Sequence, residues 1–278
     1  MSLLRCRISP DADDLFMFRA LLLGLVDTEG LDFDISSDHT DALNRLASGG
    51  DVDLCAVSIA WYPSLARRWQ LMSNGGSVGR GYGPVVVAPE AGPLEALRGR
   101  RIAVPGLTTT AYVVLRLMLD FEPVVVPITP PDAVFEEIEA RHVDAALLIH
   151  EGRLTFGERG LFQVTDIGAQ WAALTGLPLP LGGNVIRRSL GPQLIARATR
   201  VVGRSIAHGL AHRDEAIAWL LERGGALRSA AAVDHYLSLY ANADTLDYGA
   251  DGRRAIAVLL QRAEAAGLVE PVGDVDFS

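Results

Sequence analysis

The sequence predicts an α/β protein built of two lobes with a cleft between them. Short apolar runs alternate along the chain with amphipathic stretches, and this alternation is typical of parallel strands covered by helices. A glycine-rich crossing at residues 73–84 separates two such sets, and long helices rich in alanine, leucine and arginine follow residue 190. We therefore expect one lobe to comprise residues 1–86 and 186–278 and the other to comprise residues 87–185.

The elements before the crossing follow from apolar periodicity and from turn residues. Leu4–Ile8 is predicted to be a strand that ends at Ser9-Pro10, and the acidic residues at the start of Asp13–Leu25 favour a helix N-terminus. Pro63 suits the first turn of a helix. The further predicted elements are strands at 31–35 and 52–57 and helices at 40–47 and 59–69.

The elements after the crossing repeat the alternation and then change character. The predicted strands are 85–88, 101–104, 124–126 and 144–149, and the predicted helices are 93–97, 109–119 and 133–140. The C-terminal part is expected to form helices at 191–223, 229–241 and 251–266. Ligands bind at the carboxyl ends of the strands in open α/β sheets, so the residues that follow each strand are candidates for the cleft.

Composition excludes several classes of function. With 278 residues, 49% of them hydrophobic and 21% charged, the chain has the make-up of an ordinary globular protein. All 25 basic residues are arginines. The lack of lysine excludes a Walker A phosphate loop. It also excludes an internal Schiff base, so pyridoxal phosphate enzymes and lysine-type aldolases are ruled out.

Charge and cysteine usage narrow the partners and the location. A net charge of −9 has the wrong sign for tracking nucleic-acid phosphates. Cys6 and Cys55 show no CxxC spacing, so neither a cysteine zinc site nor a disulfide framework is indicated. The first residues contain no long apolar segment of a signal peptide, and no window approaches the roughly 18 apolar residues of a membrane span. We expect a cytoplasmic protein that binds neither nucleic acid nor membrane.

Three threonines open the predicted helix that follows the strand at 101–104. Thr108, Thr109 and Thr110 come directly after a Pro-Gly turn and Leu107. Free N–H groups at a helix start, together with hydroxyl donors, suit a carboxylate or a phosphate. One threonine could instead be a simple N-cap, which needs no ligand. A cap uses one hydroxyl and three are present, so we expect an anion site.

His150 directly follows the predicted buried strand at 144–149. It therefore lies at the strand end where ligands bind, and a neutral imidazole there can act as a general base near neutral pH. Glu151 and Arg153 could orient the ring, or they could pair with each other. The residues alone leave a structural and a catalytic histidine equally open.

Polar residues also follow two strands of the first set. Ser58 could donate to a ligand or cap the next helix, and without a Gly-x-Ser-x-Gly context it is not a hydrolase nucleophile elbow. Ser9 and Asp14 could face the same cleft, with Asp11 and Asp13 between them. Clustered aspartates suit magnesium or calcium, but the spacing is not that of an EF-hand and acidic residues are common at helix starts. We expect no metal.

Five short blocks occur in one order along the chain. They are Ser9-Pro10 with Asp14, Gly75-Gly76 and Gly79-Arg80-Gly81 before Gly83-Pro84, Val104-Pro105-Gly106 with Thr109-Thr110-Ala111-Tyr112, Ile149-His150-Glu151 with Arg153, and Thr175 to Gly182. In this order, from about residue 5 to about residue 250, the chain resembles the 1,4-dihydroxy-6-naphthoate synthase family of the futalosine route to menaquinone.

The resemblance implies a two-lobed fold like that of type II periplasmic binding proteins. It also implies conversion of cyclic dehypoxanthinylfutalosine to 1,4-dihydroxy-6-naphthoate without an added cofactor. His150 matches the proton acceptor of the family. The residues that match substrate-binding segments or belong to the matching blocks, and are expected to bind a small-molecule carboxylate, are Ser9, Asp14, Ala56, Val57, Ser58, Thr109, Thr110 and Arg153.

Two departures from the family pattern bear on the substrate. Asp11, Ala12 and Asp13 stand where the family often has Cys-Pro-Asn, and Cys55–Val57 contains no basic residue where some relatives carry a lysine. The alternatives are a non-catalytic solute-binding or sensor protein of the same fold and the related chorismate dehydratase. The His150-Glu151 block favours the naphthoate synthase. A monomer or a homodimer is expected.

Overall fold

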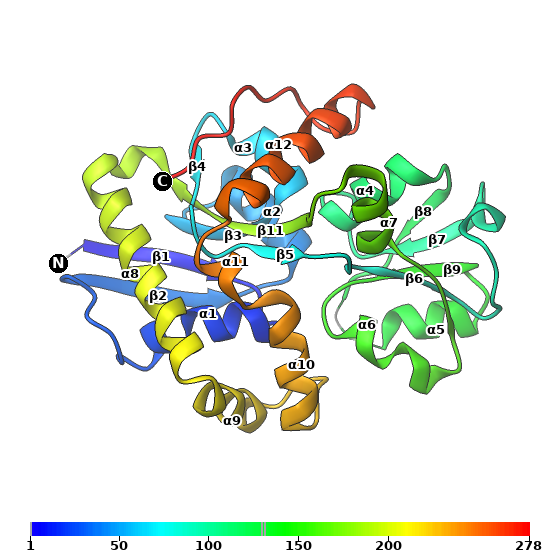
Figure 1. Ribbon diagram of the computed structural model, residues 1–278, viewed down its shortest axis with the longest axis horizontal. Helices are drawn as coiled ribbons and strands as arrows, with labels where there is room; N and C mark the ends of the chain where they lie inside the picture. The colour runs from blue at the N-terminus through cyan, green and yellow to red at the C-terminus, as the bar shows by residue number, and fades with distance from the viewer. Residues whose placement is uncertain (1, 129, 131) are drawn as a thin grey trace.

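The computed structural model describes residues 2–128, 130 and 132–278, which form two sheets with helices around them (Figure 1). The strands of the first sheet lie in the order β2 (Leu31–Ser37), β1 (Ser2–Ile8), β3 (Leu54–Ser58), β11 (Leu179–Arg187) and β4 (Trp69–Leu71), and β5 (Ser77–Gly79) also pairs with β11. The order in the second sheet is β10 (Phe162–Asp166), β6 (Val85–Ala88), β9 (Ala145–Leu148), β7 (Arg101–Val104) and β8 (Glu122–Val125). The predicted α/β class is confirmed.

The expected parallel strands are present, but both sheets are mixed. Strands β1, β2 and β3 are parallel, as are β7, β8 and β9. However, β11 runs antiparallel to β3, and β6 runs antiparallel to both β9 and β10. The chain enters β11 from the side of the second sheet. Strand β11 therefore runs toward the end of the first sheet at which its neighbour β3 begins, and the two strands are antiparallel.

The chain passes between the sheets twice, once between β5 and β6 and once before β11 (Figure 1). Val85 already pairs in the second sheet, and Gly182 already pairs with Ser58 in the first. Both crossings therefore lie ahead of the expected boundaries at residues 86 and 185. The division of the chain into two lobes stays a prediction of the sequence.

The first sheet is covered on both faces. In β1, Leu4, Cys6 and Ile8 alternate with arginines and are buried, which is the period of a half-buried strand. They pack against α1 (Ala12–Leu22) and α8 (Pro192–Ala211). The other helices of this part are α2 (Thr40–Gly49), α3 (Tyr62–Leu65), α9 (Arg213–Arg223), α10 (Ala230–Tyr240), α11 (Ala243–Leu246) and α12 (Gly249–Ala265).

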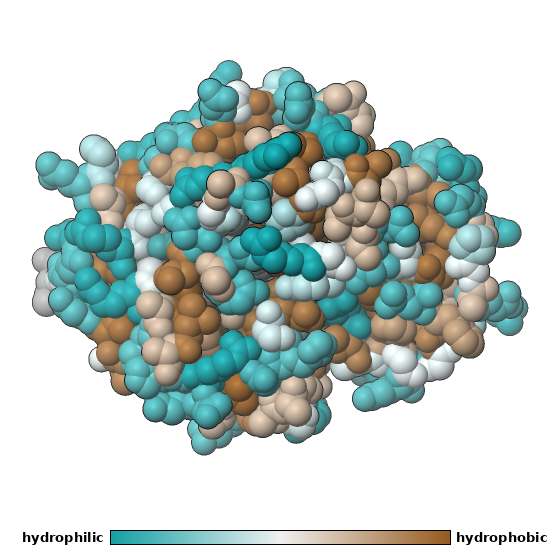
Figure 2. All heavy atoms as spheres, viewed as in Figure 1, coloured by the Kyte–Doolittle hydropathy of each residue, from teal (hydrophilic) through white to brown (hydrophobic). Residues whose placement is uncertain are grey.

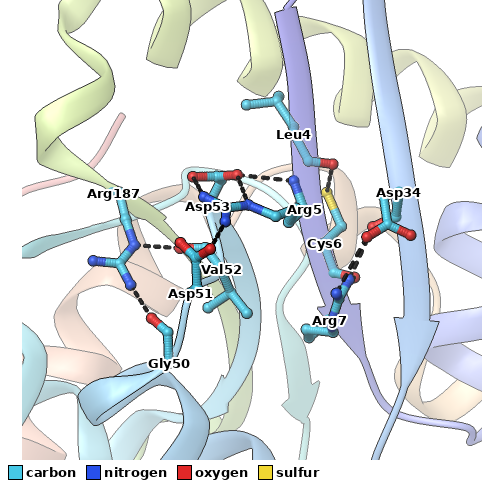
Figure 3. A network of polar contacts seen from close by, with 10 residues as sticks. All are labelled: Leu4, Arg5, Cys6, Arg7, Asp34, Gly50, Asp51, Val52, Asp53 and Arg187. Atoms are coloured by element: carbon cyan, nitrogen blue, oxygen red, sulfur yellow. Dashed lines mark hydrogen bonds and ion pairs between the residues drawn. The ribbon is translucent and has the colours of Figure 1, made fainter.

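Three arginines tie strands of the first sheet together (Figure 3). The Nε atom of Arg5 donates to an oxygen of Asp53 at 3.0 Å, just before β3 begins. Arg7 donates to Asp34 of β2 at 3.2 Å. The guanidinium of Arg187 donates to backbone carbonyls of the segment that leads into β3. These bonds fix β1 to β2 and β3, and β11 to the segment before β3. Two of these strands, β1 and β3, carry candidate site residues at their carboxyl ends.

Helices α4 (Thr110–Met118), α5 (Ala133–Glu139), α6 (Gly152–Thr155) and α7 (Ile167–Thr175) accompany the second sheet, as Figure 1 shows. The predicted helices at 59–69 and 191–223 differ most from the structure. The 59–69 segment ends as a helix at Leu65, because Trp69 joins the sheet opposite Arg187. The 191–223 segment breaks at His212 into α8 and α9.

The surface in Figure 2 is mainly hydrophilic on the face shown, with smaller hydrophobic patches between. Among the described residues, no helix is long and apolar enough to cross a membrane.

Candidate functional site

A cavity lies where the ends of β1, β3 and β9 approach the start of α4. Segments of both sheets contribute to its wall, and Tyr236 and Tyr240 of α10 complete it. Most of the residues that the sequence nominates for substrate binding or catalysis line this cavity: Ser9, Asp14, Ala56, Val57, Ser58, Thr109, Thr110 and His150. Arg153 is not part of its lining.

His150 connects the two sheets across the cavity. It follows β9 of the second sheet and has the positive φ of 51° that is uncommon for a residue with a side chain. Its Nδ1 atom lies 2.9 Å from an oxygen of Asp11, which follows β1. Its Nε2 atom lies 3.2 Å from the hydroxyl of Thr40, at the start of α2. Both ring nitrogens therefore contact residues from segments that belong to the first sheet and its helices.

The charge around His150 changes its proton affinity. Burial alone would lower the pKa of the ring, but the Asp11 charge and hydrogen bond, with the charges of Asp13 and Glu151, raise the pKa to about 10. The ring therefore binds a proton more tightly than an ordinary histidine.

Three further carboxyl groups surround this pair. Asp13 accepts hydrogen bonds from Ser77 at 2.7 Å and from Tyr236 at 3.1 Å. Burial and the nearby Asp11 charge raise the pKa of Asp13, and burial with the Asp13 charge raises the pKa of Asp14 well above its ordinary value. Burial and Asp11 raise the pKa of Glu151 to about 7. No group of three metal-ligating side chains is positioned to hold an ion in the described part of the chain.

Ser58 is held by Asn44, a residue that the sequence reasoning missed. The Asn44 amide accepts from the Ser58 backbone N–H at 2.8 Å and donates to the Ser58 hydroxyl at 3.1 Å. The same amide donates to the Thr108 hydroxyl at 2.8 Å. Of the two readings of Ser58, capping by its side chain is absent. The available signal was the position of Asn44 on the buried face of α2, beside Leu43 and Ala47.

The three threonines at the start of α4 all bond to protein groups. Thr109 is the N-cap, accepting from the Tyr112 N–H at 3.2 Å, so the simpler reading holds for this residue. Thr110 donates to the Leu181 carbonyl at 2.6 Å, which joins α4 to β11. The Thr108 hydroxyl donates to Asp41 at 2.6 Å. Because Thr109, Thr110 and Ala111 line the cavity, the helix start faces it, and the anion site stays a prediction.

Arg153 lies behind the cavity wall. Its guanidinium pairs with Asp166 at 3.0 Å and stacks over the ring of Tyr82, whose centroid is 5.9 Å away. The suggested pairing of Arg153 with Glu151 is not the contact observed. Its role in substrate binding stays a prediction.

Comparison with known proteins adds to this geometry. A family model described as menaquinone biosynthesis matches residues 4–265. The chain is 41% identical over 272 residues to a protein of Thermus thermophilus named 1,4-dihydroxy-6-naphtoate synthase, covering 98% of this chain and 97% of that protein. A protein of Streptomyces coelicolor with the same name is 37% identical over 274 residues, covering 97% of this chain and 96% of that protein.

Solved structures share the architecture. A crystal structure of an Archaeoglobus fulgidus protein has a TM-score of 0.89 and 38% identity, covering 96% of this chain and 98% of that one. The periplasmic aliphatic sulphonate binding protein of Escherichia coli has a TM-score of 0.67 at 13% identity, covering 99% of this chain and 91% of that one. The latter likeness concerns the fold alone, and it confirms the expected periplasmic-binding-protein-like fold.

Proposed function

Because the chain belongs to the menaquinone biosynthesis family, we propose that it is a 1,4-dihydroxy-6-naphthoate synthase, a carbon–carbon lyase acting on cyclic dehypoxanthinylfutalosine. The observation that carries the proposal is the position of His150, which lines the cavity with Nδ1 on Asp11 and Nε2 at Thr40. A histidine held in this way has Nδ1 fixed on a carboxylate and Nε2 turned toward a hydroxyl that itself lines the cavity.

In the proposed reaction, His150 removes a proton from the substrate through Nε2. Cleavage of a carbon–carbon bond and aromatisation of the product then drive release. The pKa of the ring, raised to about 10, means that the free protein holds a proton on His150 at neutral pH. Since the base must be neutral to accept a proton, we expect the rate to rise as the pH rises toward that value.

The substrate carboxylate is assigned to the start of α4. Thr109, Thr110 and Ala111 line the cavity there, and helix N-termini favour anions. Ser58, fixed by Asn44, supplies a further hydroxyl near this helix start, because the same Asn44 amide also bonds Thr108. In this proposal the cavity closes over the bound substrate and excludes water, which strengthens these polar interactions and protects the intermediate.

A non-catalytic solute-binding or sensor protein is less well supported. The solute-binding neighbours share the fold at low identity, whereas the named synthases match almost the whole chain. The related chorismate dehydratase is not favoured either. A cytoplasmic location, a monomeric or homodimeric state and the lack of a cofactor remain part of the proposal.

The test is an anaerobic assay of the purified protein with cyclic dehypoxanthinylfutalosine, in which the product is identified by its mass. His150→Ala is assayed beside it, with binding of the compound measured for both proteins. Turnover by the wild type, and binding without turnover by the variant, would support the synthase with His150 as its base. A wild type that binds the compound without converting it would overturn the proposal and favour a binding protein.

A further inference from the structure

The carboxylate of Asp11 and the ring of His150 come from different sheets and meet at 2.9 Å. A carboxylate only accepts hydrogen bonds, so the Nδ1 atom that faces it must carry the proton. In the neutral ring, Nε2 is then the unprotonated nitrogen. The Thr40 hydroxyl lies 3.2 Å from it and lines the cavity.

We propose that Asp11 is a positioning residue that fixes the tautomer and the orientation of His150, so that the basic nitrogen faces the substrate. The proposal rests on the proposed function, in which His150 is the base. Asp11 does not line the cavity that holds Ser58 and Thr109; it lines a neighbouring cavity that His150 also lines. In this proposal it acts on the substrate through the ring of His150.

Both partners are held rigidly. The Ser9 hydroxyl donates to the Asp11 carboxylate, and the Asp11 carbonyl accepts from the Leu15 N–H at 3.0 Å, in the first turn of α1. His150 adopts a left-handed backbone conformation, which persists only where the surroundings over-determine it. Its contacts to Asp11 and Thr40 supply that constraint.

The neighbouring acidic groups have other partners. Asp13 is bonded by Ser77 and Tyr236, Asp14 by the Ser9 N–H at 2.6 Å, and Glu151 by the Ala12 N–H at 3.3 Å. Asp13 and Glu151 therefore act on the ring through their charge and not through a hydrogen bond. His39, before α2, also faces Asp11 and helps to lower the pKa of its carboxyl group. Among the carboxylates facing His150 in the described residues, Asp11 alone has a hydrogen bond to the ring.

Two substitutions at Asp11 test this role. Asp11→Asn keeps the shape of the side chain and removes its charge, and Asp11→Cys removes both the charge and the carboxylate oxygens that face Nδ1. Asp34→Asn is the matched control, since Asp34 is a half-exposed carboxylate paired with Arg7 on β1.

Two readouts separate positioning from a purely structural role. The first is an NMR titration of the His150 ring nitrogens in the free protein, assigned with His150→Gln. The second is the pH dependence of kcat with cyclic dehypoxanthinylfutalosine. For Asp11→Asn and Asp11→Cys we expect the His150 titration and the acid limb of kcat to move together to lower pH by about one unit or more. We also expect kcat at its optimum to fall about 10- to 100-fold, with KM within roughly threefold.

Unchanged His150 titration and unchanged pH dependence in folded Asp11→Asn and Asp11→Cys proteins would overturn the proposal. A lower kcat with no shift in either titration would also overturn it, because a structural effect alone would produce that result. If the wild-type protein forms no product, the proposed function fails by itself. The NMR titration still decides then whether Asp11 controls the ring of His150.

Discussion

The side-chain amide of Asn44 forms two hydrogen bonds to Ser58, accepting from its backbone N–H at 2.8 Å and donating to its hydroxyl at 3.1 Å. Asn44 is fully buried on α2, and Ser58 ends β3 at the cavity. A third bond from the same amide reaches Thr108, which belongs to the segment before α4. One buried side chain thus joins a helix, a strand end and the second part of the chain around the cavity.

Replacing Asn44 with alanine removes all of these bonds and leaves a buried N–H of Ser58 without its partner. We expect Asn44→Ala to lower the free energy of unfolding by about 2–4 kcal/mol, since an unsatisfied buried donor adds to the lost packing. Urea denaturation followed by circular dichroism measures this loss. Gln193→Ala, an exposed position on α8, is the control and should change stability by less than about 0.5 kcal/mol. Equal stability of the two variants would contradict the prediction.

Gly168 lies in the first turn of α7 and packs against Tyr82 and Gly83, in the segment by which the chain first crosses from one sheet to the other. A Cβ atom added to Gly168 would overlap the backbone carbonyl of Tyr82, which cannot move aside as a side-chain end can. Alanine would gain about 1 kcal/mol in helix propensity. Overpacking against backbone costs about 1–3 kcal/mol or more, so the clash decides the sign.

We therefore expect Gly168→Ala to lower the melting temperature clearly, measured by differential scanning calorimetry. Gly157→Ala is the matched control, because a Cβ atom at Gly157 meets open space. A Gly168→Ala protein that melts at or above the wild-type temperature would show that α7 can move away from the first crossing at little cost.

The thiols of Cys6 and Cys55 are expected to be inert in the folded protein. Burial raises the pKa of both thiols, to about 12 for Cys55, and only the thiolate reacts readily. We expect no labelling by iodoacetamide at pH 8 in native conditions and modification of both residues after unfolding in guanidinium. Mass spectrometry of the intact protein counts the labels. Rapid labelling of Cys55 in the native protein would contradict this prediction. It would mean that the packing around β3, which forms part of the cavity wall, opens often.

The site residues that follow strands could be predicted from the sequence, whereas their hydrogen-bond partners could not. His150, Ser58 and Ser9 follow buried strands, and strand ends can be located from apolar runs alone. The partners of these residues depend on tertiary placement. Asp11 lies 139 positions from His150 in sequence order, and no local pattern indicates that the two side chains meet.

The returning strand β11 was missed for a similar reason. Its sequence, Leu179 to Arg187, contains a proline and two glycines that are typical of loops, yet its hydrogen bonds to β3 and β4 make it a central strand of the first sheet. Pairing with strands from distant parts of the chain overrides the local propensity. The mixed direction of the sheet follows from this strand and is therefore invisible in local periodicity.

Glu151 makes the stability of the protein depend on pH. Burial and the Asp11 charge raise its pKa to about 7 in the folded protein, above the ordinary value of 4.5. The folded state therefore binds this proton more tightly than the unfolded state. Below the unfolded pKa of 4.5, Glu151 does not lower the free energy of unfolding. As the pH rises from 4.5 to about 7, ionisation of this side chain lowers the free energy of unfolding progressively. Above about pH 7 the loss stays constant.

Glu151→Gln removes the charge and keeps an oxygen for the Ala12 N–H. We expect the variant to equal the wild type in unfolding free energy near pH 4.5 and to exceed it by about 1–3 kcal/mol at pH 8, from urea denaturation at both pH values. Glu158→Gln, an exposed position on the neighbouring turn, should show no such difference between the two pH values. A gain that is the same at both pH values would mean that the side chain's shape, and not its ionisation, limits stability. A loss at pH 8 would mean that the ionised Glu151 stabilises the protonated ring of His150 by more than its own burial costs.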